Sequence, residues 1–200
     1  ELRQALALAI NREILAEKVL GAGELPGWSI VPPGIEGYEP AQMLYAGATQ
    51  QEREQEARRL FRKSGFASGD SMRLELRYNT SGVHRRVAVA VSAMWRQVLG
   101  VNTDLVNEEW KVFVSNRRMG IVTEVFRGGW MADYADPGSF LDLFAAEARL
   151  SGTFYADDSY DNLLKQAAVA EGQERMELLR QAEFRLTRDM PVIPLYYYVS

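Results

Sequence analysis

In the middle of the chain, segments with apolar residues at the spacing of a strand alternate with segments at the spacing of a helix. This alternation constrains the fold more than any other feature. From Met72 to Tyr78 apolar residues occupy every second position, the period of a strand with one buried face. Four further segments continue the alternation: a helix at 83–99, a strand at 101–106, a helix at 108–119 and a strand at 121–126. Strands and helices in this order predict an α/β fold, with a largely parallel sheet flanked by helices and right-handed crossovers.

The segments on either side of this alternation are mostly helical in pattern. Residues 2–20 and 51–64 predict helices that end at Gly21 and Gly65. The proline- and glycine-rich segment 21–49 predicts a long, irregular connection that packs on the surface through its aromatic residues. The remaining expected elements are helices at 137–146, 160–170 and 174–188 and a final strand at 192–199.

Capping residues are expected at the start of two helices in the second half of the chain. Asp136 precedes a proline, a residue favoured at the first helical position, and Asp157, Asp158 and Ser159 precede the helix at 160–170. These acids lack the alternate-residue spacing and central glycine of a calcium loop. Asp136 is therefore expected to be structural, and N-cap chemistry is expected before the helix at 160–170.

The composition excludes several classes of protein. The 200 residues are 47% hydrophobic and 25% charged, which suits one globular domain or one lobe of a larger molecule. The absence of cysteine and a single histidine, His84, exclude disulfides and zinc-thiolate or histidine-rich metal sites, and no cofactor is expected. A net charge of −4 argues against nucleic-acid binding. No apolar run is long enough to span a membrane.

The loop Arg127-Gly-Gly-Trp130-Met-Ala-Asp133-Tyr134 is the strongest candidate for a binding site. It follows the strand at 121–126, and α/β proteins bind ligands at the carboxyl ends of their strands. A carboxylate beside aromatic faces and shielded from water attracts a cation strongly. The loop is therefore predicted to seat a small cationic group. Asp133 is equally suited to forming a turn, and Trp130 to packing.

A second candidate segment, 79–84, follows the first strand and should lie at the same edge of the sheet. Ser81 and His84, with Asp133 across the strand ends, make a serine hydrolase conceivable. The G-x-S-x-G elbow is missing, however, and Ser81 lies among ordinary capping residues. His84 also fits a surface histidine at a helix start, and Arg117 and Arg127 fit solvent-facing or paired arginines.

Four runs of sequence resemble the periplasmic oligopeptide-binding proteins of ABC importers: Tyr78–His84, Leu105–Phe113, Arg127–Tyr134 and Val192–Val199. The resemblance covers essentially the whole chain. It implies a type II periplasmic binding fold, of which residues 1–200 form a single α/β lobe, the C-terminal peptide-binding part of a two-lobe protein whose second lobe is missing here. It also implies a non-enzymatic role, an oligopeptide ligand, ABC permease subunits as partners, and a location in the periplasm or at a lipid anchor on the cytoplasmic membrane.

The resemblance implies a role for each matching residue. Asp133 would receive the α-ammonium of the peptide. The first side-chain pockets would be lined by Gly129, Trp130 and Met131, and further walls would be formed by Trp110, Val114 and Tyr198. Basic positions that meet the peptide carboxylate are matched by His84, Arg117 and Arg127. The remaining ligand-binding positions are Asn79, Ser151 and Thr153. Within the family, a dipeptide, a murein peptide or a chelated metal remains an alternative solute.

Overall fold

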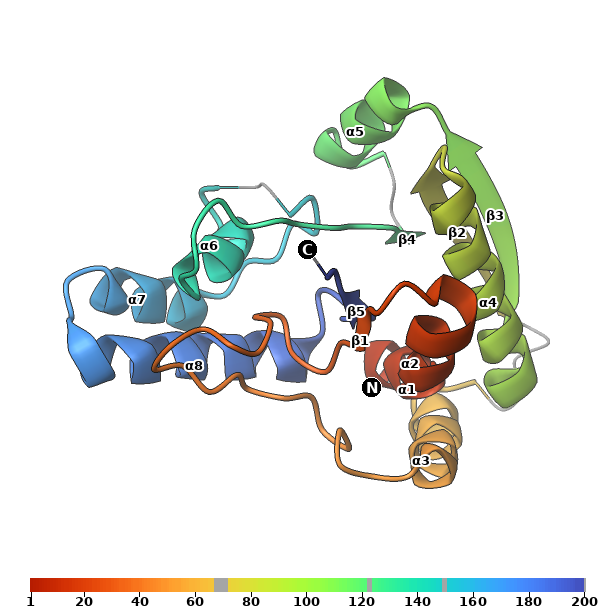
Figure 1. Ribbon diagram of the computed structural model, residues 1–200. Helices are drawn as coiled ribbons and strands as arrows, with labels where there is room; N and C mark the ends of the chain where they lie inside the picture. The colour runs from red at the N-terminus through yellow and green to blue at the C-terminus, as the bar shows by residue number, and fades with distance from the viewer. Residues whose placement is uncertain (67–71, 122–123, 149–150, 200) are drawn as a thin grey trace. The chain divides into compact units, whose positions relative to one another are not determined.

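The computed structural model describes residues 1–66, 72–121, 124–148 and 151–199 (Figure 1). The chain divides into two compact units, and each unit combines segments that are distant in sequence. Unit 1 comprises Glu1–Pro26, Gly47–Arg127 and Leu195–Ser200. Unit 2 comprises Gly27–Ala46 and Gly128–Pro194.

The main sheet of unit 1 is parallel, as the alternation of periods predicts. Its strands β2 (Arg73–Asn79), β3 (Asn102–Glu108) and β4 (Val125–Phe126) have the order β3-β2-β4. In this register Leu76 lies opposite both Leu105 and Val125. The predicted strand at 121–126 is described only in part, since residues 122 and 123 lie outside the described ranges.

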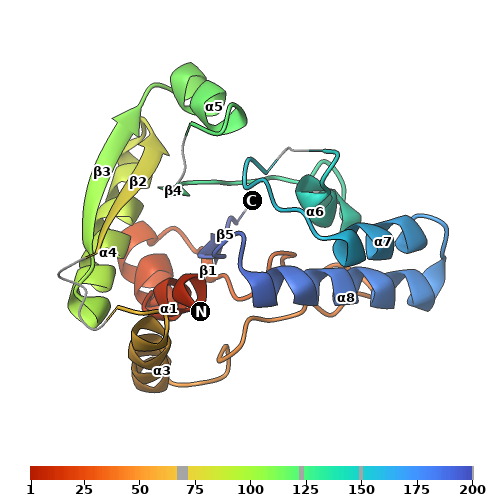
Figure 2. The same cartoon turned by 180° about the vertical axis from the view of Figure 1, so that it is seen from behind.

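Helix α4 (Gly82–Leu99) connects β2 to β3 and runs beside them in both views (Figures 1 and 2). Val87, Val91 and Trp95 lie on its buried face, as the helical period predicts. The indole Nε1 of Trp95 donates a 2.9 Å hydrogen bond to the carbonyl of Leu6, so this helix also holds the start of the chain. Gly100 ends the helix in the left-handed region, at φ 75°.

The bounds of two further helices of unit 1 lie within two residues of the bounds predicted from the sequence. α3 (Gln50–Lys63) begins with a capping box, in which Thr49 and Glu52 each satisfy the backbone N–H of the other. α5 (Trp110–Arg118) connects β3 to β4, and the Glu109 carboxylate accepts hydrogen bonds from the first N–H groups of this helix.

The predicted helix at 2–20 is wrong as a continuous element. The chain instead forms α1 (Leu2–Leu8), α2 (Arg12–Ile14) and the π-helix η1 (Leu15–Leu20), which ends at Gly21. The break is stabilised by Arg12, which is fully buried and donates from Nη1 to the carbonyls of Ala7 at 2.9 Å and Ile10 at 3.3 Å. The Ala7 carbonyl belongs to the last turn of α1, where a cation is favoured.

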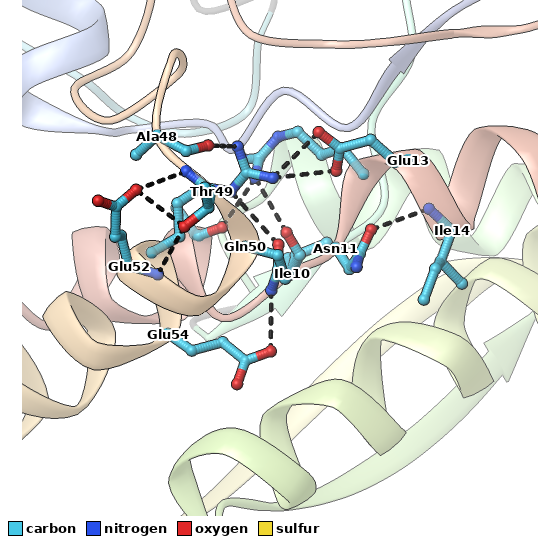
Figure 3. Close-up of polar contacts among 12 residues, drawn as sticks. Ile10, Asn11, Glu13, Ile14, Ala48, Thr49, Gln50, Glu52 and Glu54 are labelled. Atoms are coloured by element: carbon cyan, nitrogen blue, oxygen red, sulfur yellow. Dashed lines mark hydrogen bonds and ion pairs between the residues drawn. The ribbon is translucent and has the colours of Figure 1, made fainter.

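The charge of a second arginine, Arg53, acts on Arg12. Figure 3 labels Glu13 and Ala48, two partners of Arg53 in this region. Arg53 donates to the carbonyl of Ala48 at 2.7 Å and pairs with Glu13 at 3.0 Å. Burial, followed by the charge of Arg53, lowers the pKa of Arg12 to about 9. These contacts connect α3 to the break between α1 and α2.

The final strand is shorter than predicted. β5 (Tyr196–Tyr197) pairs antiparallel with β1 (Leu25–Pro26), and together they form a separate two-stranded sheet in unit 1.

Unit 2 is helical in its described part. Its elements are α6 (Gly138–Leu141), the 3-10 helix η3 (Asp142–Phe144), α7 (Asp158–Ala167) and α8 (Gly172–Asp189). α7 and α8 lie side by side in both views (Figure 2). The predicted helix at 137–146 is therefore shorter, because the backbone becomes extended at Ala145. Asp157 caps α7 as predicted, accepting a 2.6 Å hydrogen bond from Tyr160 N.

Residues 21–49 were expected to pack on the surface, and for the part within unit 2 this expectation is wrong. Val31 and Tyr38 belong to the core of unit 2. The buried Glu183 of α8 holds the segment: Oε1 accepts from the N–H groups of Ile30 at 2.9 Å and Val31 at 2.7 Å. Oε2 accepts from the Tyr38 hydroxyl at 2.7 Å and from Ala41 N at 2.8 Å. Four donors thus replace water around a carboxylate in the interior.

Replacing Glu183 with glutamine should destabilise the chain by on the order of 3 kcal/mol, because the new amide nitrogen would face donors instead of accepting from them. Urea denaturation followed by circular dichroism measures this loss. The control is Glu177→Gln on the same helix, where an exposed pair with Arg180 is lost and the midpoint should barely move. Equal midpoints for the two variants would contradict a structural role for Glu183.

Candidate functional site

The parallel register brings several candidate residues to one edge of unit 1. Asn79 at the end of β2 lies opposite Glu108 at the end of β3. Arg127 follows β4, and its backbone N–H donates to the carbonyl of Arg77 at 2.8 Å, which extends the pairing of β4 with β2. Asn79 and Arg127 therefore share the carboxyl edge of the sheet, the position at which α/β proteins bind ligands.

His84 lies in the first turn of α4, near this edge. Burial lowers the pKa of its imidazole, the positive charge of Arg127 adds to the effect, and a hydrogen bond with the Asn79 backbone opposes it. Ser81 caps the helix, with its hydroxyl accepting from His84 N at 3.5 Å. Within the described ranges no hydrogen bond joins the Ser81 hydroxyl to the His84 ring, so the arrangement required of a serine nucleophile is missing there.

Arg117 and Arg127 bring two more positive charges to the same edge. The Arg117 guanidinium lies over the rings of Phe113, at 5.9 Å, and Phe126, at 5.5 Å. Burial, and then the charges of Arg118 and Arg127, lower the pKa of Arg117. In the part of the chain that the structure describes, neither arginine nor His84 forms an ion pair. An anionic group would be attracted to this edge of the sheet.

The remaining candidates of unit 1 supply exposed aromatic surface. Trp110 is 53% exposed and stacks on the buried Phe113, with ring centroids 6.3 Å apart, while Val114 is half-buried. Tyr198 is exposed, accepts a hydrogen bond from Arg127 and meets the ring of Tyr196 edge to face at 5.5 Å. The arginine and the tyrosine therefore fix each other beside the strand ends.

The loop that carries Asp133 lies in unit 2. Its candidates Gly129, Trp130, Met131 and Asp133 are all exposed, and Trp130 is 46% exposed. The Asp133 carboxylate makes no hydrogen bond or ion pair with any described residue. In this structure the carboxylate is exposed to solvent, and the first buried residue after it is Pro137.

Asp136, three residues later, has the opposite environment. Its carboxylate accepts from Gly138 N at 2.8 Å and forms a two-point ion pair with Arg175 of α8, both contacts at 2.8 Å. The hydrogen bond from Arg175 lowers the pKa of Asp136. Asp136 is therefore structural, as the sequence predicts, although Pro137 and not Asp136 is the residue that directly precedes α6.

Ser151 and Thr153 also lie in unit 2, and their hydroxyl oxygens are 2.9 Å apart. The turn between them is made by the buried Gly152 at φ 72°. Ser151 N donates to the carbonyl of Leu143 at 3.0 Å, which ties the turn to the end of η3. Both side chains are half-buried.

The described residues form two separate sets of candidates. Unit 1 holds the basic and aromatic set, which consists of Asn79, His84, Trp110, Val114, Arg117, Arg127 and Tyr198. Unit 2 holds the carboxylate loop and the hydroxyl pair, which consist of Gly129, Trp130, Met131, Asp133, Ser151 and Thr153. Sequence reasoning missed Glu108 as a site residue, although an acid at the carboxyl end of a predicted strand is the signal that could have found it.

The described ranges contain no group of three or more histidine, cysteine, aspartate or glutamate side chains arranged to hold a metal ion. None of the helices in those ranges combines the length and the apolar character needed to cross a bilayer.

The two neighbouring aspartates should respond differently to substitution. Asp136→Asn removes the pair with Arg175 and should lower the unfolding midpoint, whereas Asp133→Asn should leave it unchanged. Because the folded-state pKa of Asp136 lies below its unfolded value, its contribution to stability is present above the unfolded pKa and is lost as the pH falls through the folded pKa. Thermal unfolding from pH 7 to pH 3 should show this loss in the parent chain and a smaller one in Asp136→Asn. Equal midpoints for the two variants would be the contrary result.

Comparisons with known proteins point in one direction. The family model for bacterial extracellular solute-binding proteins, family 5 Middle, matches residues 1–152. Over 199 residues the chain is 37% identical to the periplasmic oligopeptide-binding protein OppA of Salmonella typhimurium, covering 99% of this chain and 36% of that protein. It is 33% identical to the periplasmic murein peptide-binding protein MppA of Escherichia coli, again over 199 residues, with 99% and 37% covered.

Solved structures give the same result. The unliganded open form of MppA superposes with a TM-score of 0.92 at 33% identity, covering 98% of this chain and 38% of that one. Haemophilus influenzae OppA in complex with RPPGFSPFR superposes with a TM-score of 0.91 at 29% identity, with 98% and 39% covered. These likenesses confirm the predicted fold class. The chain spans well under half the length of these relatives.

Proposed function

Because the chain belongs to family 5 of the bacterial extracellular solute-binding proteins, we propose that it is the peptide-binding lobe of a larger, two-lobe binding protein that captures oligopeptides for an ABC importer. The observation that carries the proposal is the exposed Asp133 carboxylate, which follows the exposed Trp130 by three residues and makes no hydrogen bond or ion pair with any described residue. Relatives named for oligopeptide binding share 37% and 34% identity with the chain, which supports the same class of ligand.

In this proposal Asp133 receives the ammonium group at the amino end of the peptide. A charge-assisted hydrogen bond of this kind recognises a group that all unblocked peptides share. Gly129, Trp130 and Met131 line the first side-chain pockets, and Ser151 and Thr153 offer hydroxyl groups to the ligand. A binding protein for many peptide sequences must obtain its affinity from shared features of the ligand, namely its backbone and its charged ends.

The basic edge of unit 1 offers positive charge to a peptide carboxylate. His84, Arg117 and Arg127 are candidates for the peptide carboxylate, since none of them forms an ion pair within the described ranges. Trp110, Val114 and Tyr198 offer apolar and aromatic walls, and Asn79 lies in the turn at the strand edge. The buried Asn79 Oδ1 has no partner among the described residues, so it can accept a hydrogen bond from a ligand N–H.

The wider roles follow from the same family membership. We propose a non-enzymatic protein that acts in the periplasm, free or lipid-anchored at the outer face of the cytoplasmic membrane, and that delivers its ligand to permease subunits. Ser81 serves as a helix cap in unit 1, which removes support from the alternative of a serine hydrolase. Other relatives in the family are named for binding murein peptides and dipeptides. These alternative ligands differ from the proposed oligopeptide in the length and type of peptide. A chelated metal is the other solute to test.

Asp133→Asn in the longer protein should weaken the binding of unblocked peptides by roughly a hundredfold, because the variant loses a charge-assisted hydrogen bond to the peptide ammonium. N-acetylated peptides lack the ammonium, so the same substitution should change their affinity little. Isothermal titration calorimetry with matched free and acetylated peptides measures both effects.

The matched control is Asp158→Asn, another exposed carboxylate of unit 2 that lies at the start of α7. It should leave the affinity for both kinds of peptide unchanged. Tight binding of unblocked peptides by Asp133→Asn would refute the ammonium contact. Binding of a different solute, with no peptide binding by the parent protein, would refute the proposed ligand class.

A further inference from the structure

We infer that Glu108 is a positioning residue for ligand binding: its carboxylate holds α5, which carries Trp110 and Arg117, against the carboxyl edge of the parallel sheet. The inference rests on the proposed function, which assigns ligand contacts to those two residues. Glu108 itself contacts no ligand in this account and acts through the helix.

The carboxylate of Glu108 connects a strand to a helix through a single oxygen atom. Its Oε1 accepts from Nη1 of Arg77 on β2 at 2.8 Å and from Nδ2 of Asn116 on α5 at 2.7 Å. The backbone of Glu108 is fixed as well, since its carbonyl accepts from Thr80 N at 2.8 Å. The end of β3, the middle of β2 and the second half of α5 therefore meet at this residue.

This contact is nearly removed from water. The side chain of Glu108 is 11% exposed and that of Arg77 is 20% exposed. The second carboxylate oxygen, Oε2, is buried and has no hydrogen-bond partner among the described residues. Because a buried charge is costly without partners, the position of this carboxylate depends on the two bonds of Oε1.

The same contact lies next to the basic candidates. Asn116 directly precedes Arg117, whose guanidinium lies 5.5 Å from the ring centre of Phe126. Phe126 is the register partner of Arg77, and the Arg77 carbonyl accepts from Arg127 N at 2.8 Å. Loss of the Glu108 contact should therefore release α5 and move Arg117, while the backbone pairing that holds Arg127 remains.

Hydrogen exchange without any ligand tests the structural half of this inference. In Glu108→Ala, the amides of α5 should exchange on the order of tenfold faster than in the parent protein, while the amides of α4 keep their protection. Glu108→Gln retains an oxygen at the Oε1 position and should recover part of the protection. Unchanged exchange in α5, or an equal increase in α4 and α5, would overturn the inference.

The matched control is Asp104→Ala. Asp104 also lies on β3 and pairs with an arginine of β2, Arg73, but this pair is exposed and, among the described residues, makes no hydrogen bond or ion pair with α5. Its loss should leave the exchange of α5 unchanged. Faster α5 exchange in this control would show that any lost pair between β2 and β3 loosens the helix, and would overturn a specific role for Glu108.

Calorimetry on the longer protein tests the consequence for binding. Glu108→Ala should weaken binding of peptides with a free carboxyl end by on the order of tenfold and should affect their C-terminal amides less, because Arg117 is displaced. N-acetylation of the peptide, which tests the contact with Asp133, should change the affinity of Glu108→Ala by the same factor as it changes the affinity of the parent protein. Equal weakening for free and amidated peptides would contradict positioning through Arg117. If the parent binds no peptide, the proposed function fails, and the exchange experiment still decides whether Glu108 holds α5.

Discussion

The pairing of β2 with a strand on each side is the constraint on which unit 1 depends. β2 pairs in parallel with β3 along its whole length and with β4 over two residues, and the N–H of Arg127 continues that second ladder. Parallel strands in register align their carboxyl ends. Backbone hydrogen bonds alone therefore place Asn79, Glu108 and Arg127 at one edge, before any side chain contributes.

The charged residues that stabilise the fold have partners within the chain, and the charged candidates for ligand binding form no ion pair with any described residue. Glu183 has four donors, and Asp136 has Arg175, so neither carboxylate is available to another molecule. Asp133 and the basic edge of unit 1 have no such partners within the described ranges. Taken separately, the carboxylate loop has the charge that suits an ammonium, and the basic edge has the charge that suits a carboxylate.

The sequence predicted what hydrophobic period and capping residues decide, and it failed where buried charged side chains decide. The parallel sheet and the helices at 51–64 and 83–99 follow from hydrophobic period and capping residues, so they were predicted closely. The break in the helix at 2–20 depends on the buried Arg12, which bonds carbonyls only a few residues before it, and the path of 27–46 depends on Glu183, more than 140 residues away. The hydrophobic period of the sequence shows neither that Arg12 is buried nor which segment Glu183 contacts. The site residues came from a family resemblance, and their exposure could not be predicted from it.

The exposure of Asp133 determines what binding would require. An ammonium 4 Å from a carboxylate gains about 1 kcal/mol in water and about 4 kcal/mol near a protein surface, where the effective dielectric is lower. The loop that carries Asp133 is open to solvent, so its own residues do not supply that lower dielectric. In the role proposed for Asp133, firm binding of a peptide amino end would need a second protein surface that covers the loop and excludes water. In a two-lobe binding protein, closure around the ligand would supply this surface, and affinity and closure would then be one event.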